Sequence, residues 1–105
     1  MKSKRAKATD ISQSVKNAVW ERDKHRCIIC DNTEAMPNAH YIPRSKGGLG
    51  IEENIVTLCF KCHHMYDFGG KAQREELGQQ IKGHLMLQYP EWDEEKLIYK
   101  KWSLI

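Results

Sequence analysis

The sequence of 105 residues contains no long hydrophobic run, no internal repeat and no linker that would separate two domains. A helix that crosses a membrane needs roughly 20 consecutive apolar residues, so we expect no membrane span. The basic N-terminus is not followed by an apolar stretch, so it lacks the rest of a signal peptide, which predicts a cytoplasmic location. One small domain can bury only about 60 to 70 per cent of its unfolded surface, so extra stabilisation is expected.

Charge is unevenly distributed along the chain. The net charge is only +3, but residues 1–50 carry ten Lys and Arg against five Asp and Glu, while residues 51–105 carry seven against nine. A basic half attracts a polyanion such as nucleic acid. Lysines that simply keep the protein soluble explain the same counts, so charge alone does not decide between the two interpretations.

The four cysteines form two CxxC pairs that lie about 30 residues apart. Two residues between cysteines let both sulfurs reach one ion, and two such pairs supply the four tetrahedral ligands of a structural zinc site. The reducing cytoplasm also favours metal binding over disulfides. We therefore predict a structural zinc ion bound by Cys27, Cys30, Cys59 and Cys62.

The N-terminal segment 1–9 is basic and has no apolar residue to anchor it. This pattern predicts a disordered arm that either touches phosphates or is simply solvated. A single domain is expected over residues 10–105. Apolar residues at helical spacing predict that it begins with a helix over about 11–24, with Asp10 or Ser12 as the cap.

The segment between the cysteine pairs predicts two short strands. One strand is expected around residues 39–43, a glycine-rich loop over 45–50, and a second strand before a helix that starts near Phe60. Strand, loop, strand and helix together form a β-loop-β-helix unit over about residues 27–68.

The C-terminal part predicts two more helices, over about residues 71–102. The first runs over about 71–88 and stops at Tyr89-Pro90. Asp93 can cap a last short helix. Its inward residues are expected to be Leu97, Ile98 and Trp102. The whole pattern predicts an α+β fold.

Three runs occur in a fixed order, AHYIPRSKGG (39–48), NIVTLC (54–59) and CHH (62–64). Together they resemble the HNH endonuclease family, and the resemblance covers residues 27–68. It implies a ββα-metal fold, the treble-clef-like His-Me finger, stapled by the four-cysteine zinc site. The C-terminal helices are similar to the tails of small HNH proteins of phages and prophages, which implies the cytoplasm of a bacterial host.

The resemblance implies that His40 is the general base, that Asn54 orients it and that His63 holds a divalent metal. Asn54 would bind either the second imidazole nitrogen or the loop backbone. Asp67 lies four residues after His63, so both project from one helix face and can reach a common ion. A carboxylate suits magnesium or manganese, with nickel or zinc as alternatives. His64 points about 100 degrees away from His63 and is expected to meet phosphate.

Ala39 departs from the family pattern, because many relatives carry a metal-ligating aspartate or histidine immediately before the base. Either Asp67 and waters complete the metal shell, or His64 fills in, or metal affinity is weak. Arg44 and Lys46 are expected to contact DNA phosphates, with Arg44 as the bidentate partner.

The implied function is metal-dependent hydrolysis of DNA phosphodiester bonds, by nicking or double-strand cleavage, in a phage or prophage setting. Two alternatives are a zinc-stapled module that binds DNA without cutting it, and an accessory nuclease subunit that docks onto a phage DNA-packaging (terminase) enzyme through its acidic C-terminal helices. Gly47 and Gly48 form an ordinary turn or let the loop approach a DNA backbone closely. No coiled-coil seam is present that would decide the oligomeric state, and the expectation is a monomer or a weak dimer.

Overall fold

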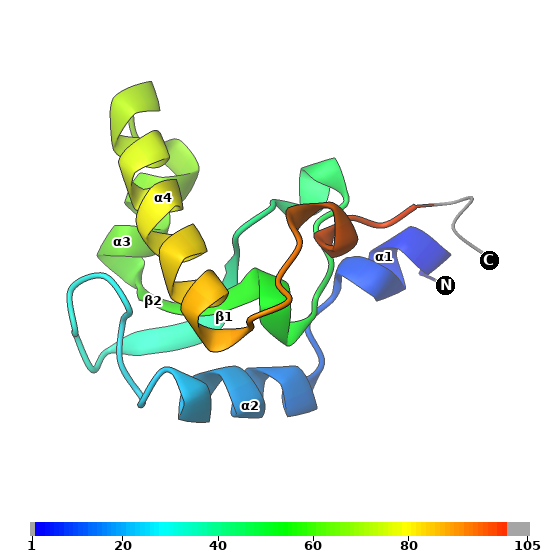
Figure 1. Cartoon of the computed structure of the whole chain (residues 1–105), viewed down its shortest axis with the longest axis horizontal. Coiled ribbons are helices and arrows are strands. Elements are labelled where there is room, and N and C mark those ends of the chain that lie inside the picture. The colour runs from blue at the N-terminus through cyan, green and yellow to red at the C-terminus, as the bar shows by residue number, and fades with distance from the viewer. Residues whose placement is uncertain (1, 101–105) are drawn as a thin grey trace.

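A computed structural model describes residues 2–100 of the chain. It contains a two-stranded antiparallel sheet with helices around it (Figure 1). The helices and strands are, in order, α1 (Lys4–Thr9), α2 (Gln13–Arg22), β1 (Ala35–His40), β2 (Ile55–Cys59), α3 (Phe60–Phe68) and α4 (Lys71–Gln88). Short 3-10 turns lie at Arg44–Lys46, Glu52–Asn54 and Glu94–Leu97. The predicted α+β class and the order strand, strand, helix are confirmed.

The sheet pairs β1 with β2, with Ala39 opposite Val56 and His40 opposite Ile55. The sequence predicts the first strand at 39–43, and this position is wrong, because β1 ends at His40. The Tyr41 amide still donates to the Asn54 carbonyl, but the Ile42 amide after it donates to the side chain of Asn54 instead of to a strand partner, so the pairing does not continue. The register is irregular between Met36 and Ala39.

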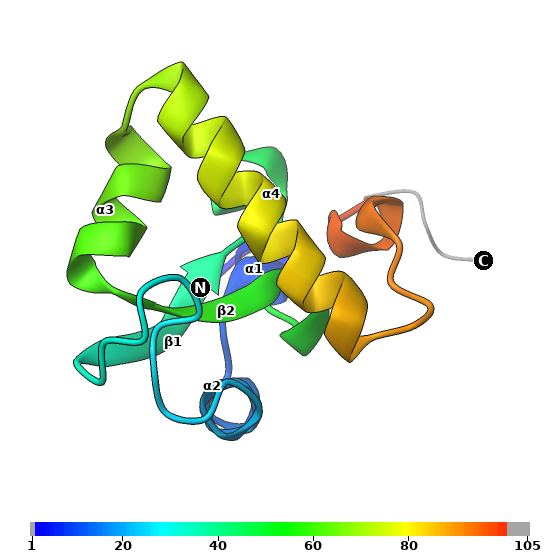
Figure 2. The same cartoon turned by 60° about the vertical axis from the view of Figure 1, so that its left-hand side comes forward.

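The core lies between the sheet and α4, which crosses it in Figure 2, while α2 runs along the other side. Every residue of β2 is buried, and α4 contributes Leu77, Ile81 and Leu85 at helical spacing. Three of the four cysteines are buried in the same core. The predicted helix over 71–88 is confirmed with those bounds.

Helix α2 begins where the side chain of Ser12 accepts a hydrogen bond from the amide of Val15, so Ser12 is its cap. It ends at Arg22, somewhat earlier than predicted. The next residue, Asp23, is buried and accepts hydrogen bonds from Arg22, His84 and the Thr57 amide. This carboxylate therefore links α2, β2 and α4.

The N-terminal segment folds back as helix α1, where the sequence predicts a disordered arm. The difference arises from tertiary contacts with the loop that follows β1. The Arg5 side chain donates to the Ser45 carbonyl at 3.0 Å, and the Gly50 amide donates to the Ala8 carbonyl at 3.0 Å. A Cβ atom on Gly50 would lie 1.9 Å from the Asp10 carbonyl oxygen, so only glycine permits this approach.

The C-terminal segment crosses back over the loop. Asp93 caps a single 3-10 turn rather than the predicted helix, and Leu97 is buried beneath it. Ile98 pairs with Gly48 in an isolated bridge. Trp102, which was expected to face inward, lies outside the described residues. No helix within residues 2–100 has the length and apolar character needed to cross a bilayer.

Candidate active site

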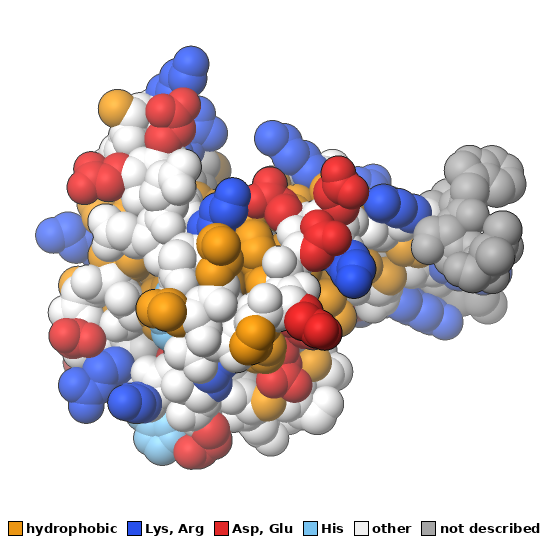
Figure 3. Space-filling model, in the orientation of Figure 1, with side chains coloured by type: hydrophobic (Ala, Val, Ile, Leu, Met, Phe, Trp, Pro, Cys, Tyr) orange, Lys and Arg blue, Asp and Glu red, His pale blue; other side chains and the backbone are white. Residues whose placement is uncertain are grey.

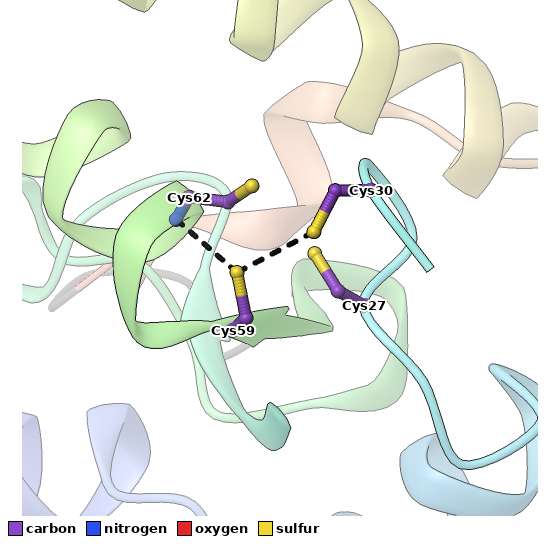
Figure 4. A group of neighbouring side chains, drawn as sticks. All are labelled: Cys27, Cys30, Cys59 and Cys62. Carbon is purple, nitrogen blue, oxygen red and sulfur yellow. Dashed lines mark hydrogen bonds between the residues drawn. The ribbon is translucent and has the colours of Figure 1, made fainter. Parts of the chain in front are cut away.

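The four cysteine thiols form one cluster (Figure 4). Their sulfur atoms all lie within 4.8 Å of one another, and the Cys30 and Cys59 sulfurs are 3.6 Å apart. A tetrahedral zinc ion with bonds of about 2.3 Å places its sulfurs ~3.8 Å apart, so the cluster fits zinc. None of the four forms a disulfide. The predicted ligand set is therefore assembled in space.

Each cysteine pair is held by local backbone structure. In the first pair, the Asp31 amide donates to the Cys27 carbonyl and the Ile28 amide donates to the Thr57 carbonyl of β2. In the second pair, Cys59 ends β2 and caps α3, because its sulfur accepts from the Cys62 amide. The cluster thus fixes the start of α3 against the sheet.

A cleft of about 720 Å³ opens between β1, α3 and the N-terminal segment. It brings together His40 and the two metal-ligand candidates of α3, His63 and Asp67, as the sequence predicts. Its walls also carry polar residues that the motif does not name. These are Lys2, Asp10, Lys16 and Asn38. Lys2 and Asp10 reach the cleft only because α1 folds back, and no local sequence signal indicates this.

His40 is held by the N-terminal segment. Its Nε2 lies 2.8 Å from the Thr9 carbonyl oxygen. A carbonyl can only accept, so Nε2 carries the proton and Nδ1 is the basic nitrogen of the neutral ring. Burial lowers the pKa of His40, the Thr9 carbonyl opposes this shift, and the nearby positive charge of Arg44 reinforces it. The neutral imidazole is therefore favoured at pH 7.

Asn54 is fully buried, and the hydrogen bonds of its side chain go to Ile42 and Leu49 rather than to His40. Its side-chain oxygen accepts from the Ile42 amide at 2.8 Å. Its side-chain nitrogen donates to the carbonyls of Ile42 at 3.1 Å and Leu49 at 2.9 Å. Of the two partners considered for Asn54, the loop backbone is the one observed. Asn54 thereby fixes the loop that leaves the end of β1.

His63 and Asp67 lie on the same face of α3, and their Nε2 and Oδ2 atoms are 3.3 Å apart. One nitrogen and one carboxylate oxygen at this separation suit a hard divalent cation that keeps several waters. Within residues 2–100, only the four cysteines bring three or more possible metal-ligating groups together. A catalytic cation would therefore need a further donor.

Ala39 cannot be that donor, nor does its position face the cleft. It is fully buried among the core residues, because side chains alternate along β1. Asn38 and His40 lie two residues apart and both line the cleft. The Asn38 Oδ1 atom is buried and has no hydrogen-bond partner among residues 2–100. An orphaned carbonyl oxygen is the type of hard ligand that the site lacks.

The predicted DNA contacts divide into two groups. Arg44 lines the cleft, but its guanidinium is ion-paired with Asp10, which also pairs with Lys2. Lys46 and His64 are exposed outside the cleft lining. His64 instead lies between two phenylalanines on α3.

The glycine loop packs closely against the backbone of another segment of the chain. Gly47 adopts a φ of +83°, and both Gly47 and Gly48 are buried. A Cβ atom on Gly48 would lie 1.7 Å from the Ile42 carbonyl oxygen. The close neighbour of Gly48 is therefore the chain's own backbone, which agrees with the ordinary-turn interpretation, and an approach to a DNA backbone stays a prediction.

The fold and site together define a ββα unit with a four-cysteine metal cluster at its base and a histidine-lined cleft above it. Residues 27–68 match the model of the family described as HNH endonuclease. The chain is therefore similar to this family over residues 27–68. The matched segment contains the four cysteines and the cleft residues His40, His63 and Asp67.

A similar curated protein is Anaredoxin of Nostoc sp. (strain PCC 7120 / SAG 25.82 / UTEX 2576), which is 35% identical over 48 residues. The match covers 45% of this chain and 63% of that protein, so the chain spans less than two thirds of its relative. No solved structure matches the chain significantly.

Proposed function

We propose that the protein is a metal-dependent endonuclease that hydrolyses phosphodiester bonds of DNA in the cleft between β1 and α3. One observation supports this most strongly. His40, with its tautomer set by the Thr9 carbonyl, shares the cleft with the His63 and Asp67 pair. Metal-dependent phosphodiester hydrolysis uses a neutral base, which activates the water, beside a divalent cation, which stabilises the charge of the transition state.

In this mechanism the Nδ1 atom of His40 accepts the proton of the attacking water. The lowered pKa keeps the ring neutral for this step. His63, Asp67 and Asn38 would hold the cation, which supplies charge stabilisation of the phosphorane-like transition state. Lysines of the cleft attract the phosphate backbone, and Arg44 binds a phosphate after exchanging its partner Asp10 for it.

A plasmid-nicking assay tests the proposal. Wild-type protein is compared with His40→Ala in the presence of magnesium, manganese, nickel or zinc, and in EDTA. The matched control is His25→Ala, because His25 is exposed, contacts Trp20 and Glu21 and does not line the cleft. We expect metal-dependent nicking by wild type and by the control, and none by His40→Ala. Absence of nicking with every metal, with DNA retardation intact, would instead support the non-cleaving binding module.

We also propose a protein partner, from the charge of the C-terminal segment. Acidic side chains gather over the C-terminal segment on the face shown in Figure 3. The exposed acidic residues there are Glu91, Asp93, Glu94 and Glu95. This surface repels DNA and suits a basic protein partner, such as a phage packaging enzyme. Charge reversal at Glu91 and Glu95, which are both exposed, is expected to weaken capture of such a partner while plasmid nicking persists.

A further inference from the structure

Three aromatic rings lie in a row along the outer side of α3. Phe60 and His64 have ring centroids 6.0 Å apart, and His64 and Phe68 have centroids 5.1 Å apart. Phe60 is 85% exposed and Phe68 is 75% exposed, so neither contributes to the core. We call these three residues the aromatic ridge. Exposed phenylalanines aligned in this way mark a contact surface.

The aromatic ridge lies beside the metal-ligand candidates. Successive residues of an α-helix turn by about 100 degrees, which places the row 60, 64 and 68 next to the row 63 and 67. Phe68 itself lines the cleft that contains His40, His63 and Asp67. A strand whose phosphodiester lies at His63 therefore has its neighbouring nucleotides beside the ridge.

The charges nearby suit a polyanion rather than an apolar protein surface. Lys61 follows Phe60 and is exposed, and Lys16 lines the cleft at the other end of the ridge. Lys2 and Arg44 line it as well, and both are paired there with Asp10. α3 lies at the edge of the molecule in Figure 2, with α4 packed on one side only. A ligand with negative charges and planar rings fits this combination, which describes a nucleic acid strand.

We propose that the aromatic ridge stacks on unstacked bases of the DNA strand, so that the protein selects single-stranded or unpaired DNA over a perfect duplex. The proposal rests on the proposed function, since it assumes that DNA occupies the cleft. In a duplex the base faces are covered by their neighbours, and only an unstacked base offers a face to a phenylalanine ring. Stacking of this kind tolerates any base, so it selects DNA structure rather than sequence.

The test measures binding of a single strand that carries 2-aminopurine and of the matched duplex. All proteins carry His40→Ala so that the DNA stays intact. Phe60→Ala and Phe68→Ala are compared with Leu87→Ala, because Leu87 on α4 is also 85% exposed. Zinc content and circular dichroism verify that each variant is folded.

We expect the parent to bind the single strand more tightly than the duplex and to quench 2-aminopurine fluorescence. Each phenylalanine substitution should weaken single-strand binding about tenfold and reduce the quenching, while Leu87→Ala changes neither. Unchanged single-strand binding in both phenylalanine variants would overturn the proposal and leave the ridge to a protein partner.

Metal-dependent cleavage of the same single strand and of plasmid DNA, by protein in which His40 is intact, separates the two proposals. Cleavage of either DNA together with unaffected phenylalanine variants would remove the ridge proposal and keep the nuclease. Lack of cleavage of both DNAs together with weakened single-strand binding would keep the ridge as a DNA contact and remove the nuclease.

Discussion

Asn38 and His40 lie two residues apart on β1, so both side chains face the cleft while Ala39 between them faces the core. The position that carries a metal ligand in many relatives is therefore turned away from the cleft here. His64 does not replace it, because it lies within the aromatic ridge. We propose that Asn38, whose side-chain oxygen has no hydrogen-bond partner among residues 2–100, replaces it.

Substitution of Asn38 tests this placement through metal affinity. Asn38→Ala should weaken Mn²⁺ binding about tenfold, and Asn38→Asp should strengthen it, because a carboxylate is the better hard ligand. Free Mn²⁺ measured by electron paramagnetic resonance gives the affinity without an activity assay. Asn17→Ala on the exposed side of α2 is the control. Equal Mn²⁺ affinity in all four proteins would exclude Asn38 from the metal site.

Asp23 stabilises the packing of α2, β2 and α4 and does not line the cleft. Burial raises the pKa of this carboxyl, but hydrogen bonds from His84 and Arg22 outweigh burial and hold the pKa at about 2. Asp23→Asn leaves Arg22 without its buried partner and should destabilise the fold by about 3 kcal/mol. Urea unfolding measures the difference, with Glu34→Gln on the surface as control. A loss no larger than that of the control would contradict this role.

The same carboxyl gives stability a pH dependence. An unfolded aspartate has a pKa of about 3.9, whereas Asp23 has a pKa of about 2 in the folded protein. The unfolded state therefore binds more protons between these values, so this contribution is complete above about pH 4 and is lost as the pH falls towards 2. In Asp23→Asn the free energy of unfolding should change less over that interval.

Helix α1 is short, but its position determines the geometry of the cleft. A six-residue helix is not stable by itself, so its order depends on docking against the loop that follows β1. That docking sets the Thr9 carbonyl against His40 and Asp10 against Arg44. Gly50 is the residue that allows the close approach.

Gly50→Ala should displace α1 without unfolding the core. A shift of about 1 Å in a catalytic group can reduce a rate about a hundredfold, and we expect a loss of this size in nicking. The control is Gly83→Ala, because an added Cβ atom there meets nothing within 4 Å. The imidazole signals of His40 in nuclear magnetic resonance spectra should shift in Gly50→Ala alone. Unchanged nicking and unchanged signals would show that α1 does not position the base.

For the whole molecule, the cysteine cluster stabilises a small core. Three of its four residues are core residues, so an empty cluster would leave the junction of β2 and α3 unsupported. Removal of the metal with a strong chelator should abolish cooperative thermal unfolding, and added zinc should restore it. An unchanged transition in the metal-free protein would contradict the structural role, and iron in place of zinc would contradict the predicted metal.

The parts of the fold that depend on local pattern were predictable from the sequence. For helix α4, both the helical spacing of its apolar residues and the residues at its ends can be read from the sequence. The spacing of the two cysteine pairs likewise predicts the four-cysteine cluster. The docking of α1 and the end of β1 at His40 were not predictable, because they depend on Gly50 and the Asn54 side chain meeting distant backbone. The proposed role of Asn38 depends on strand alternation in a register that only the folded sheet reveals.

The most direct test of the central claim is the pH dependence of the single-turnover nicking rate with saturating metal. If His40 is the base, the rate should rise with pH and reach half its maximum below about 6.5, the ordinary histidine value, because burial lowers the pKa of His40. His40→Ala should lose this titration together with the activity. A His40→Ala protein that nicks at the wild-type rate with the same pH profile would contradict the account.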